Sequence, residues 1–289
     1  MAQLAGRYGS FNLGMGSPPF LPPKFLRDEM VRAMEEGFNN YFPTPGQPIL
    51  RQAIAQEYGR KIGRTLKPEN SLVTVGAQEA LSVVFLTMVG PGDEILIMEP
   101  FFGEYDTAMT LSQATVRSVP QELKTDPASG ETEWHFDPQK LRELITPKTK
   151  ILVLNYPNNP TGLTLSRAQL EEISVILEDY PHVWVLSDEI YENISWGPEQ
   201  HVPFASLRNN WSKTISLYSG GKTFSATGWK IGWVVAEEDL IVEMTRLHNP
   251  LGFCFNSTGQ VAMGRSLHTV FHEPYEGAPH YGAYLCDMF

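Results

Sequence analysis

The sequence predicts an α/β fold in which a mostly parallel sheet is sandwiched by helices. Two observations indicate this fold. Short runs rich in Val, Ile and Leu alternate with segments whose apolar residues recur at helical spacing, and the apolar runs are nearly continuous. Continuous runs are typical of strands buried on both faces, and strands separated by helices favour a parallel sheet. A chain of 289 residues is long enough to bury such a core.

The elements follow one another in a regular order. Residues 1–22 are rich in Gly and Pro and predict an extended N-terminal arm, and residues 23–289 are interpreted as one large domain. Helices are expected over 24–37, 47–62, 78–88, 103–112 and 166–179. Strands are expected over 71–75, 93–100, 149–157, 183–189, 213–219 and 231–236.

Two finer features accompany these elements. Ser166 is the expected N-cap of the helix that follows it, because its hydroxyl can accept a hydrogen bond from a first-turn N–H. The stretch over 121–138 is polar and carries DPASGETE at its centre. It is expected to form an exposed excursion from the sheet.

Composition excludes several classes of partner. The formal net charge of -11 repels nucleic acid, and no basic cluster compensates for it. The two cysteines, Cys254 and Cys286, are too few for a disulfide scaffold or a metal cluster. No apolar run has the length of a membrane span, and the N-terminus has no apolar signal core. We therefore expect no membrane partner and a cytoplasmic location, with a mitochondrial one as the alternative.

The segment YSGGKTFSATGWK, over residues 218–230, is the strongest indication of chemistry. It places Lys222 after two glycines and among small hydroxyl residues, with a second cation at Lys230. An amine in such a turn can cradle a phosphate or form a Schiff base with a carbonyl cofactor. The letters GKT also end the phosphate loop of nucleotide hydrolases, but the first glycine of that pattern would fall on Ser216.

Polar residues gather where the predicted strands end. In parallel sheets, ligands lie beyond the carboxyl ends of the strands, so these residues are expected to share one cleft. The strand ends in question are 76–78, 101–103, 155–162, 188–191 and 219–222.

Three motifs occur in a fixed order: NYPNNPTG, SDEIYE and SGGKTFSATGWKIGW. Their combination resembles the fold-type I (class I/II) aminotransferases that depend on pyridoxal 5'-phosphate. The lysine segment is most similar to the kynurenine/glutamine aminotransferase branch, the cysteine-S-conjugate β-lyases. NLGMGSPPF and EPFFGEY fit that branch too, and the likeness extends from about Asn12 to about Ser266.

The resemblance implies a role for each residue around the cofactor ring. Lys222 would bond to the cofactor aldehyde and later move a proton. Asp188 would pair with the pyridine nitrogen, Asn159 and Tyr191 would bond the phenolate oxygen, and Phe102 would stack on the ring. Each also has a plainer interpretation: a helix cap or buried carboxylate for Asp188, a turn for Asn159, and core packing for Tyr191 and Phe102.

The resemblance also implies a phosphate site and a partner subunit. The phosphate would lie at a helix N-terminus formed by Gly76, Ala77 and Gln78, with Ser219 and Lys230 completing the site. The family pattern often has glycine at position 77, a departure that a backbone contact tolerates. Tyr41 matches a tyrosine that reaches the neighbouring subunit's phosphate, which implies a homodimer. Gly16 would lie beside the substrate carboxylate, with Asn159 nearby.

The main departure from the family is at the end of the chain. The resembled enzymes continue into a small domain that supplies an arginine for the substrate α-carboxylate, and this sequence ends at Phe289. We therefore expect the small domain to be largely absent. Three functions stay open: transamination between an aromatic or sulfur-containing L-amino acid, such as kynurenine or glutamine, and a 2-oxo acid; cysteine-S-conjugate β-elimination; and a catalytically impaired cofactor-binding fragment. A nucleotide hydrolase is the fourth alternative.

Overall fold

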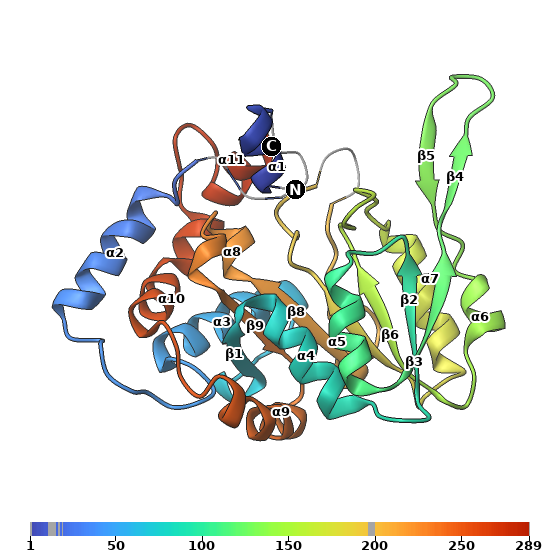
Figure 1. Cartoon of the computed structure of the whole chain (residues 1–289), viewed down its shortest axis with the longest axis horizontal. Helices are drawn as coiled ribbons and strands as arrows, with labels where there is room; N and C mark the ends of the chain where they lie inside the picture. The colour runs from blue at the N-terminus through green and yellow to red at the C-terminus, as the bar shows by residue number, and fades with distance from the viewer. Residues whose placement is uncertain (1, 11–15, 17, 19, 196–199, 289) are drawn as a thin grey trace.

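A seven-stranded sheet crosses the middle of the molecule (Figure 1). The structure is a computed structural model, and it describes residues 2–10, 16, 18, 20–195 and 200–288. The strand order is β1-β9-β8-β7-β6-β2-β3, and β9 alone in this sheet runs antiparallel to its neighbours. The strands are β1 (Ser71–Val75), β2 (Glu94–Glu99), β3 (Thr115–Pro120), β6 (Thr149–Asn155), β7 (Trp184–Asp188), β8 (Thr214–Ser219) and β9 (Ile231–Val235).

Helices cover both faces of this sheet, which confirms the predicted fold class (Figure 1). The α-helices are α1 (Ala2–Tyr8), α2 (Lys24–Glu35), α3 (Pro48–Ile62), α4 (Gly76–Met88), α5 (Glu104–Ser112), α6 (Lys140–Leu144), α7 (Arg167–Glu178), α8 (Gly220–Thr223), α9 (Glu238–Leu251), α10 (Ser257–His272) and α11 (Tyr281–Met288). Short 3-10 turns lie at Pro68–Asn70, Phe204–Ser206, Asn210–Lys213 and Thr227–Trp229. Among the described residues, no helix is both long and apolar enough to cross a membrane.

The core divides at the sheet because successive strand side chains point to opposite faces. On β7, Leu186 packs with α4, α5 and α9, whereas its neighbour Val185 packs toward α7 on the other face. Helices α2, α3, α10 and α11 pack around Tyr218 and Trp233 at the β8–β9 end. This layering buries the strands on both sides and leaves their carboxyl ends free to build a site.

Some elements differ from the sequence prediction. Ala2–Tyr8 form α1, where an extended arm is expected, because AQLAGRY is rich in good helix formers. The Gly/Pro-rich part of that arm falls mostly on residues outside the described ones. The polar excursion is a two-stranded hairpin of β4 (Glu122–Thr125) and β5 (Thr132–His135), which extends away from the sheet with residues 122–133 exposed (Figure 1).

The predicted helix cap is confirmed. The Ser166 hydroxyl accepts a hydrogen bond from the Gln169 N–H at 3.3 Å, and the Gln169 side chain accepts one from the Ser166 N–H at 3.0 Å. This reciprocal pair satisfies two N–H groups at the start of α7.

Candidate active site

A cavity of about 580 Å³ lies at the carboxyl ends of the parallel strands. Its volume falls within the range of small-molecule sites. All the residues predicted to form a cofactor and substrate site line it, with the exception of Tyr41. The lining residues are Gly16, Gly76, Ala77, Gln78, Leu81, Phe102, Glu104, Tyr105, Asn155, Asn159, Asp188, Ile190, Tyr191, Ser219, Gly221, Lys222, Thr227, Lys230 and Ile231.

Lys222 supplies an amine to this cavity from the short helix α8, directly after β8. Its Nζ donates a hydrogen bond to the Gly16 carbonyl oxygen at 2.8 Å and lies 5.4 Å from the centre of the Tyr191 ring. Burial lowers the pKa of this amine, because the charged form loses hydration. The shift favours the neutral amine, which is the form of a lysine that acts as a nucleophile or a base.

Asp188 lies at the end of β7 and is only 3% exposed. The Tyr105 hydroxyl donates a hydrogen bond to its Oδ2, and the Ile190 N–H donates one to Oδ1 at 3.2 Å. Burial raises the pKa of this carboxyl to about 6, and the hydrogen bond from Tyr105 opposes part of that rise. Within the described chain, no lysine, arginine or histidine forms an ion pair with Asp188. A buried carboxyl without a cation favours a cationic ligand.

A chain of hydrogen bonds joins Asp188 to the opposite side of the cavity. The Asn155 side-chain amide donates to the Asp188 carbonyl oxygen at 3.2 Å, and its Oδ1 accepts from the Asn159 N–H at 3.0 Å. The Asn159 amide in turn donates to the Tyr191 hydroxyl at 3.3 Å. Asn159 and Tyr191 thus present adjacent polar groups to one place in the cavity, which suits an anionic ring oxygen.

The N-terminus of α4 and the amine of Lys230 form the cationic end of the cavity. Gly76 opens the helix with φ +71°, and an added Cβ there would lie 3.5 Å from the Lys230 Nζ. The first N–H groups of a helix have no intrahelical partner and carry partial positive charge. Antiparallel pairing of Ser219 with Gly232 brings the start of β9 beside the end of β8. This end of the cavity suits a phosphate.

Gly232 allows this close approach of β9 to α4. A Cβ on Gly232 would lie 2.7 Å from the Ala77 nitrogen and 2.8 Å from the Gly76 carbonyl carbon. Both atoms belong to the backbone and cannot rotate away. Any side chain at this position would therefore displace the helix N-terminus that faces the cavity.

Comparison with known proteins identifies the family. Residues 9–273 match the family Aminotransferase class I and II. The chain belongs to the class I and II aminotransferases. It is 37% identical to kynurenine–oxoglutarate transaminase 1 of Homo sapiens, over 92% of this chain and 64% of that protein. It is 35% identical to kynurenine–oxoglutarate transaminase of Dictyostelium discoideum, over 91% of this chain and 63% of that protein. The chain thus spans about 63% of the length of that relative.

Other aminotransferases are similarly close. Aspartate aminotransferase of Pyrococcus horikoshii is 36% identical over 82% of this chain and 58% of that protein. The solved structure of N-succinyldiaminopimelate aminotransferase from Mycobacterium tuberculosis superposes with a TM-score of 0.89 at 34% identity, covering 99% of this chain and 71% of that one. The family match and the similar structure confirm the predicted family and the predicted cofactor of that family, pyridoxal 5'-phosphate. The match argues against the nucleotide-hydrolase alternative.

The cavity of this aminotransferase fits that cofactor. Three features line it at different places: the desolvated Lys222 amine, the buried Asp188 carboxyl without a cation, and the helix N-terminus beside Lys230. Pyridoxal phosphate offers an aldehyde, a basic ring nitrogen and a phosphate, which are the complementary groups. The complementarity rests on the observed lining of the cavity.

Two predicted residues are less enclosed than the others. Phe102 lines the cavity but is 44% exposed, so its ring has an open face. Tyr41 is 85% exposed and does not line the cavity of its own chain. Its ring instead packs edge-on against Phe253, with centroids 5.4 Å apart.

Sequence reasoning missed several lining residues. Tyr105 and Asn155 stand out because both hydrogen-bond to Asp188. Tyr105 is the last residue of EPFFGEY and Asn155 is the first residue of NYPNNPTG, so both lie inside motifs that indicate the family. Tyr105 lies three residues after Phe102, and Asn155 lies at the end of a predicted strand. These two positions were the signals that could have pointed to a place in the site.

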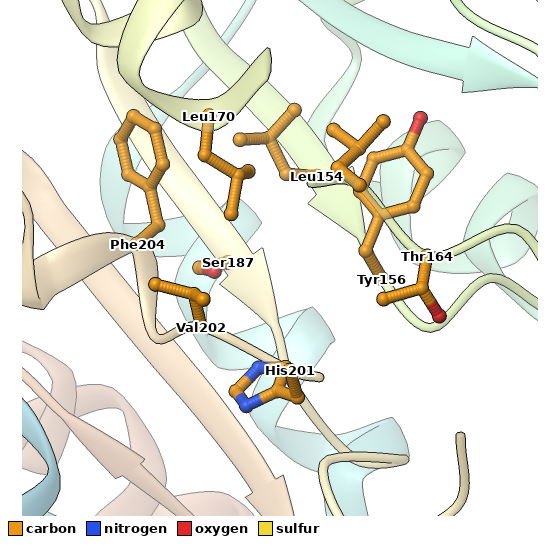
Figure 2. Close-up of a pocket in the computed structure, with 9 residues that line it drawn as sticks. Leu154, Tyr156, Thr164, Leu170, Ser187, His201, Val202 and Phe204 are labelled. Atoms are coloured by element: carbon orange, nitrogen blue, oxygen red, sulfur yellow. The ribbon is translucent and has the colours of Figure 1, made fainter. Parts of the chain in front are cut away.

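A second cavity, lined by residues of β6, β7 and α7, is too small to hold the cofactor. Figure 2 shows its lining, where the apolar side chains of Leu154, Leu170 and Phe204 surround Ser187 and His201. The cavity measures about 10 Å³, which is no more than the space of a single water molecule. Burial lowers the pKa of His201 to about 4, so this histidine is neutral.

Proposed function

We propose that this chain uses pyridoxal 5'-phosphate to transfer an amino group between an aromatic or sulfur-containing L-amino acid, such as kynurenine or glutamine, and a 2-oxo acid. One observation carries the proposal: the Lys222 amine and the Asp188 carboxyl line the same cavity. The kynurenine–oxoglutarate transaminases among the relatives support the donor class. Residues 23–289 would form the cofactor-binding large domain.

When bound, the cofactor supplies an aldehyde that condenses with amines and a ring that accepts electrons from the substrate Cα. Lys222 would be the amine that holds the aldehyde carbon before substrate arrives. The same Nζ would also be the base that moves a proton between the substrate Cα and the aldehyde carbon of the cofactor. Its lowered pKa serves both steps, because each requires the neutral amine.

Asp188 would hold a proton on the ring nitrogen. The hydrogen bonds from Tyr105 and from the Ile190 N–H fix its two oxygens, so the carboxylate does not need to reorganise during the reaction. Asn159 and Tyr191 would donate to the ring oxygen, and Asn159 with Gly16 would also contact the substrate. Ser219, Lys230 and the N–H groups of Ala77 and Gln78 after Gly76 would hold the phosphate.

A homodimer is part of the proposal. Tyr41 lies outside its own cavity and is exposed, which leaves it available to a neighbouring chain. In this arrangement Tyr41 would reach the partner's phosphate, while Phe102 would stack on the ring in its own chain. We place the protein in the cytoplasm, with the mitochondrion as the alternative compartment.

The decisive experiment maps the amine that binds the cofactor. The purified chain is mixed with pyridoxal phosphate, reduced with borohydride and digested, and the modified peptide is identified. We expect the label on Lys222. The Lys222→Met variant should lose both the label and the visible absorbance, whereas Lys213→Met, outside the cavity, should keep them. A label on Lys230, or none, would contradict the proposal.

Substrate addition then separates the remaining alternatives. Transamination predicts formation of a 2-oxo acid from kynurenine or glutamine, with matching amination of the acceptor. Release of pyruvate and a free thiol from a cysteine S-conjugate would identify the β-lyase instead. Labelling of Lys222 without turnover would identify the impaired cofactor-binding fragment.

A further inference from the structure

A cluster of potential metal ligands lies where α3 meets α10, outside the cofactor cavity. His268 and His272 are four residues apart and therefore share one face of α10. Glu57 of α3 faces both of them. The three ligand atoms lie within 4.8 Å of one another, and none of these residues lines the cofactor cavity.

We propose that Glu57, His268 and His272 bind a divalent cation of the zinc class. Two imidazoles and one carboxylate are a recurrent ligand set for Zn²⁺, and paired histidines at i and i+4 are a recurrent way to present them. A water molecule would complete the coordination. The site would link α3 to α10 through the ion.

The distances suit such a site. The Glu57 Oε1 lies 3.0 Å from the His268 Nδ1, and its Oε2 lies 2.7 Å from the His272 Nε2. Ligand atoms of a tetrahedral zinc ion are about 3.3 Å apart, given zinc–ligand bonds of about 2.0–2.1 Å. The two imidazole nitrogens lie within 4.8 Å of each other, so binding an ion would require these flexible side chains to draw together around it.

The exposure of the ligands also suits a site of this kind. Glu57 is 3% exposed, whereas the His268 and His272 side chains are 56% and 42% exposed. The carboxylate thus forms the buried base of the site, and the imidazoles form walls that open to solvent. An ion can enter from that side and keep a water ligand there.

Arg60 now supplies the positive charge at this position. Its guanidinium nitrogen lies 2.7 Å from the Glu57 Oε1 and 3.4 Å from the His272 Nε2. The Arg60 side chain is 56% exposed, so it can rotate into solvent when an ion arrives. Arg60 and the metal ion would therefore compete for the same carboxylate.

The test titrates Zn²⁺ into the cofactor-loaded chain, freed of excess cofactor, by calorimetry. Co²⁺ is then used as a visible probe of coordination. We expect one tight site per chain, and a rise in melting temperature on adding Zn²⁺. His272→Ala and His268→Ala should each weaken binding more than tenfold. Both side chains are partly exposed, so the variants should fold, as circular dichroism and the cofactor absorbance would verify.

Two further variants separate a metal site from a cluster of hydrogen bonds. Arg60→Ala should strengthen Zn²⁺ binding severalfold, because the competing cation is gone. His182→Ala, remote in the chain and bonded to the Thr146 carbonyl oxygen, should leave binding unchanged. The proposal is overturned if the wild type binds no stoichiometric Zn²⁺, if both histidine variants bind as it does, or if Arg60→Ala weakens binding.

Discussion

Among single residues, Asp188 links stability to function most directly. Its carboxyl has a pKa of about 6 in the folded chain, against an ordinary value of 3.8. Between pH 4 and 6 the folded protein therefore holds a proton that the unfolded chain has lost, and the free energy of unfolding falls as pH rises. Above pH 6 the buried charge costs roughly 3 kcal/mol, at about 1.4 kcal/mol per unit of pKa.

This cost predicts that Asp188→Asn stabilises the cofactor-free protein at pH 7.5, by roughly 1–3 kcal/mol. The amide has no charge to bury, so the gain should disappear near pH 4, where the carboxyl of the native chain is protonated. Cofactor affinity should fall, because the ring nitrogen loses its anionic partner. Urea unfolding at the two pH values measures the first effect, and cofactor titration measures the second.

A surface substitution provides the control for this prediction. Asp106→Asn removes an exposed carboxylate and should change stability by a few tenths of a kcal/mol at either pH. Equal destabilisation of Asp188→Asn at both pH values would show that burial of charge does not govern this site.

The residues proposed to carry the chemistry could be predicted from the sequence, and those that contact them could not. Lys222 and Asp188 lie in recognisable motifs, and the structure places both in the cavity. Tyr105 and Asn155 act through Asp188, and only the three-dimensional arrangement shows those contacts. Tyr41 requires a second chain for its predicted role.

At the scale of elements, the start of α4 combines backbone conformation with ligand binding. Gly76 has φ +71°, a region that costs other residues roughly 1–2 kcal/mol. A Cβ added at this position would lie 3.5 Å from the Lys230 Cε and Nζ, which is an ordinary van der Waals contact. The need for glycine at position 76 therefore comes from its backbone conformation and not from a lack of space.

Gly76→Ala is accordingly expected to destabilise the protein by roughly 1–2 kcal/mol and to weaken cofactor binding. Thermal unfolding and cofactor titration measure the two effects. Gly103→Ala is the matched control, because Gly103 precedes α5 with φ -58° and an added Cβ meets no atom within 4 Å. If both variants behave alike, backbone conformation at position 76 is not the cause.

Most strands could be predicted because they are buried on both faces and show as continuous apolar runs. Strand β3 was missed because it lies at the edge of the sheet and has exposed residues, so its sequence, TVRSVP, mixes polar with apolar. The hairpin of β4 and β5 is exposed over residues 122–133 and carries no apolar pattern. Helices α9, α10 and α11 follow the last motif, SGGKTFSATGWKIGW, and were not predicted.

At the scale of the whole molecule, the last helix packs against the lysine segment. The Tyr281 hydroxyl of α11 lies 2.9 Å from the Ser225 hydroxyl, and both residues are buried. The Tyr281 ring also lies edge-on to Phe25 and Tyr275, with centroids 5.8 Å and 5.0 Å apart. Residues 274–288 lie beyond the stretch matched to the family, yet α11 shares the core of α2, α3 and α10.

Tyr281→Phe tests this packing with the loss of a single oxygen. It should lower the free energy of unfolding by about 1–2 kcal/mol, because the buried Ser225 hydroxyl loses its partner. Urea unfolding gives the measurement. Tyr8→Phe alters a ring that is 71% exposed and should be neutral. A neutral result for Tyr281→Phe would mean that water replaces the lost contact.

The sheet order was only partly predictable at this scale. Alternation of helices and strands predicted parallel neighbours, and four of the six adjacent strand pairs in the sheet are parallel: β2–β3, β2–β6, β6–β7 and β7–β8. The reversal of β9 was not predicted, because an apolar run such as IGWVV has no direction of its own.

That reversal has a consequence for selectivity. Because β8 and β9 are hydrogen-bonded neighbours, Lys222 and Lys230 belong to one connection whose two ends are held by the same ladder. The spacing between the backbone positions of the two lysines is thus set by the sheet. A compound whose carbonyl and anionic group are too close or too far apart can engage one amine but not both, so shortened or lengthened cofactor analogues should be discriminated by length alone.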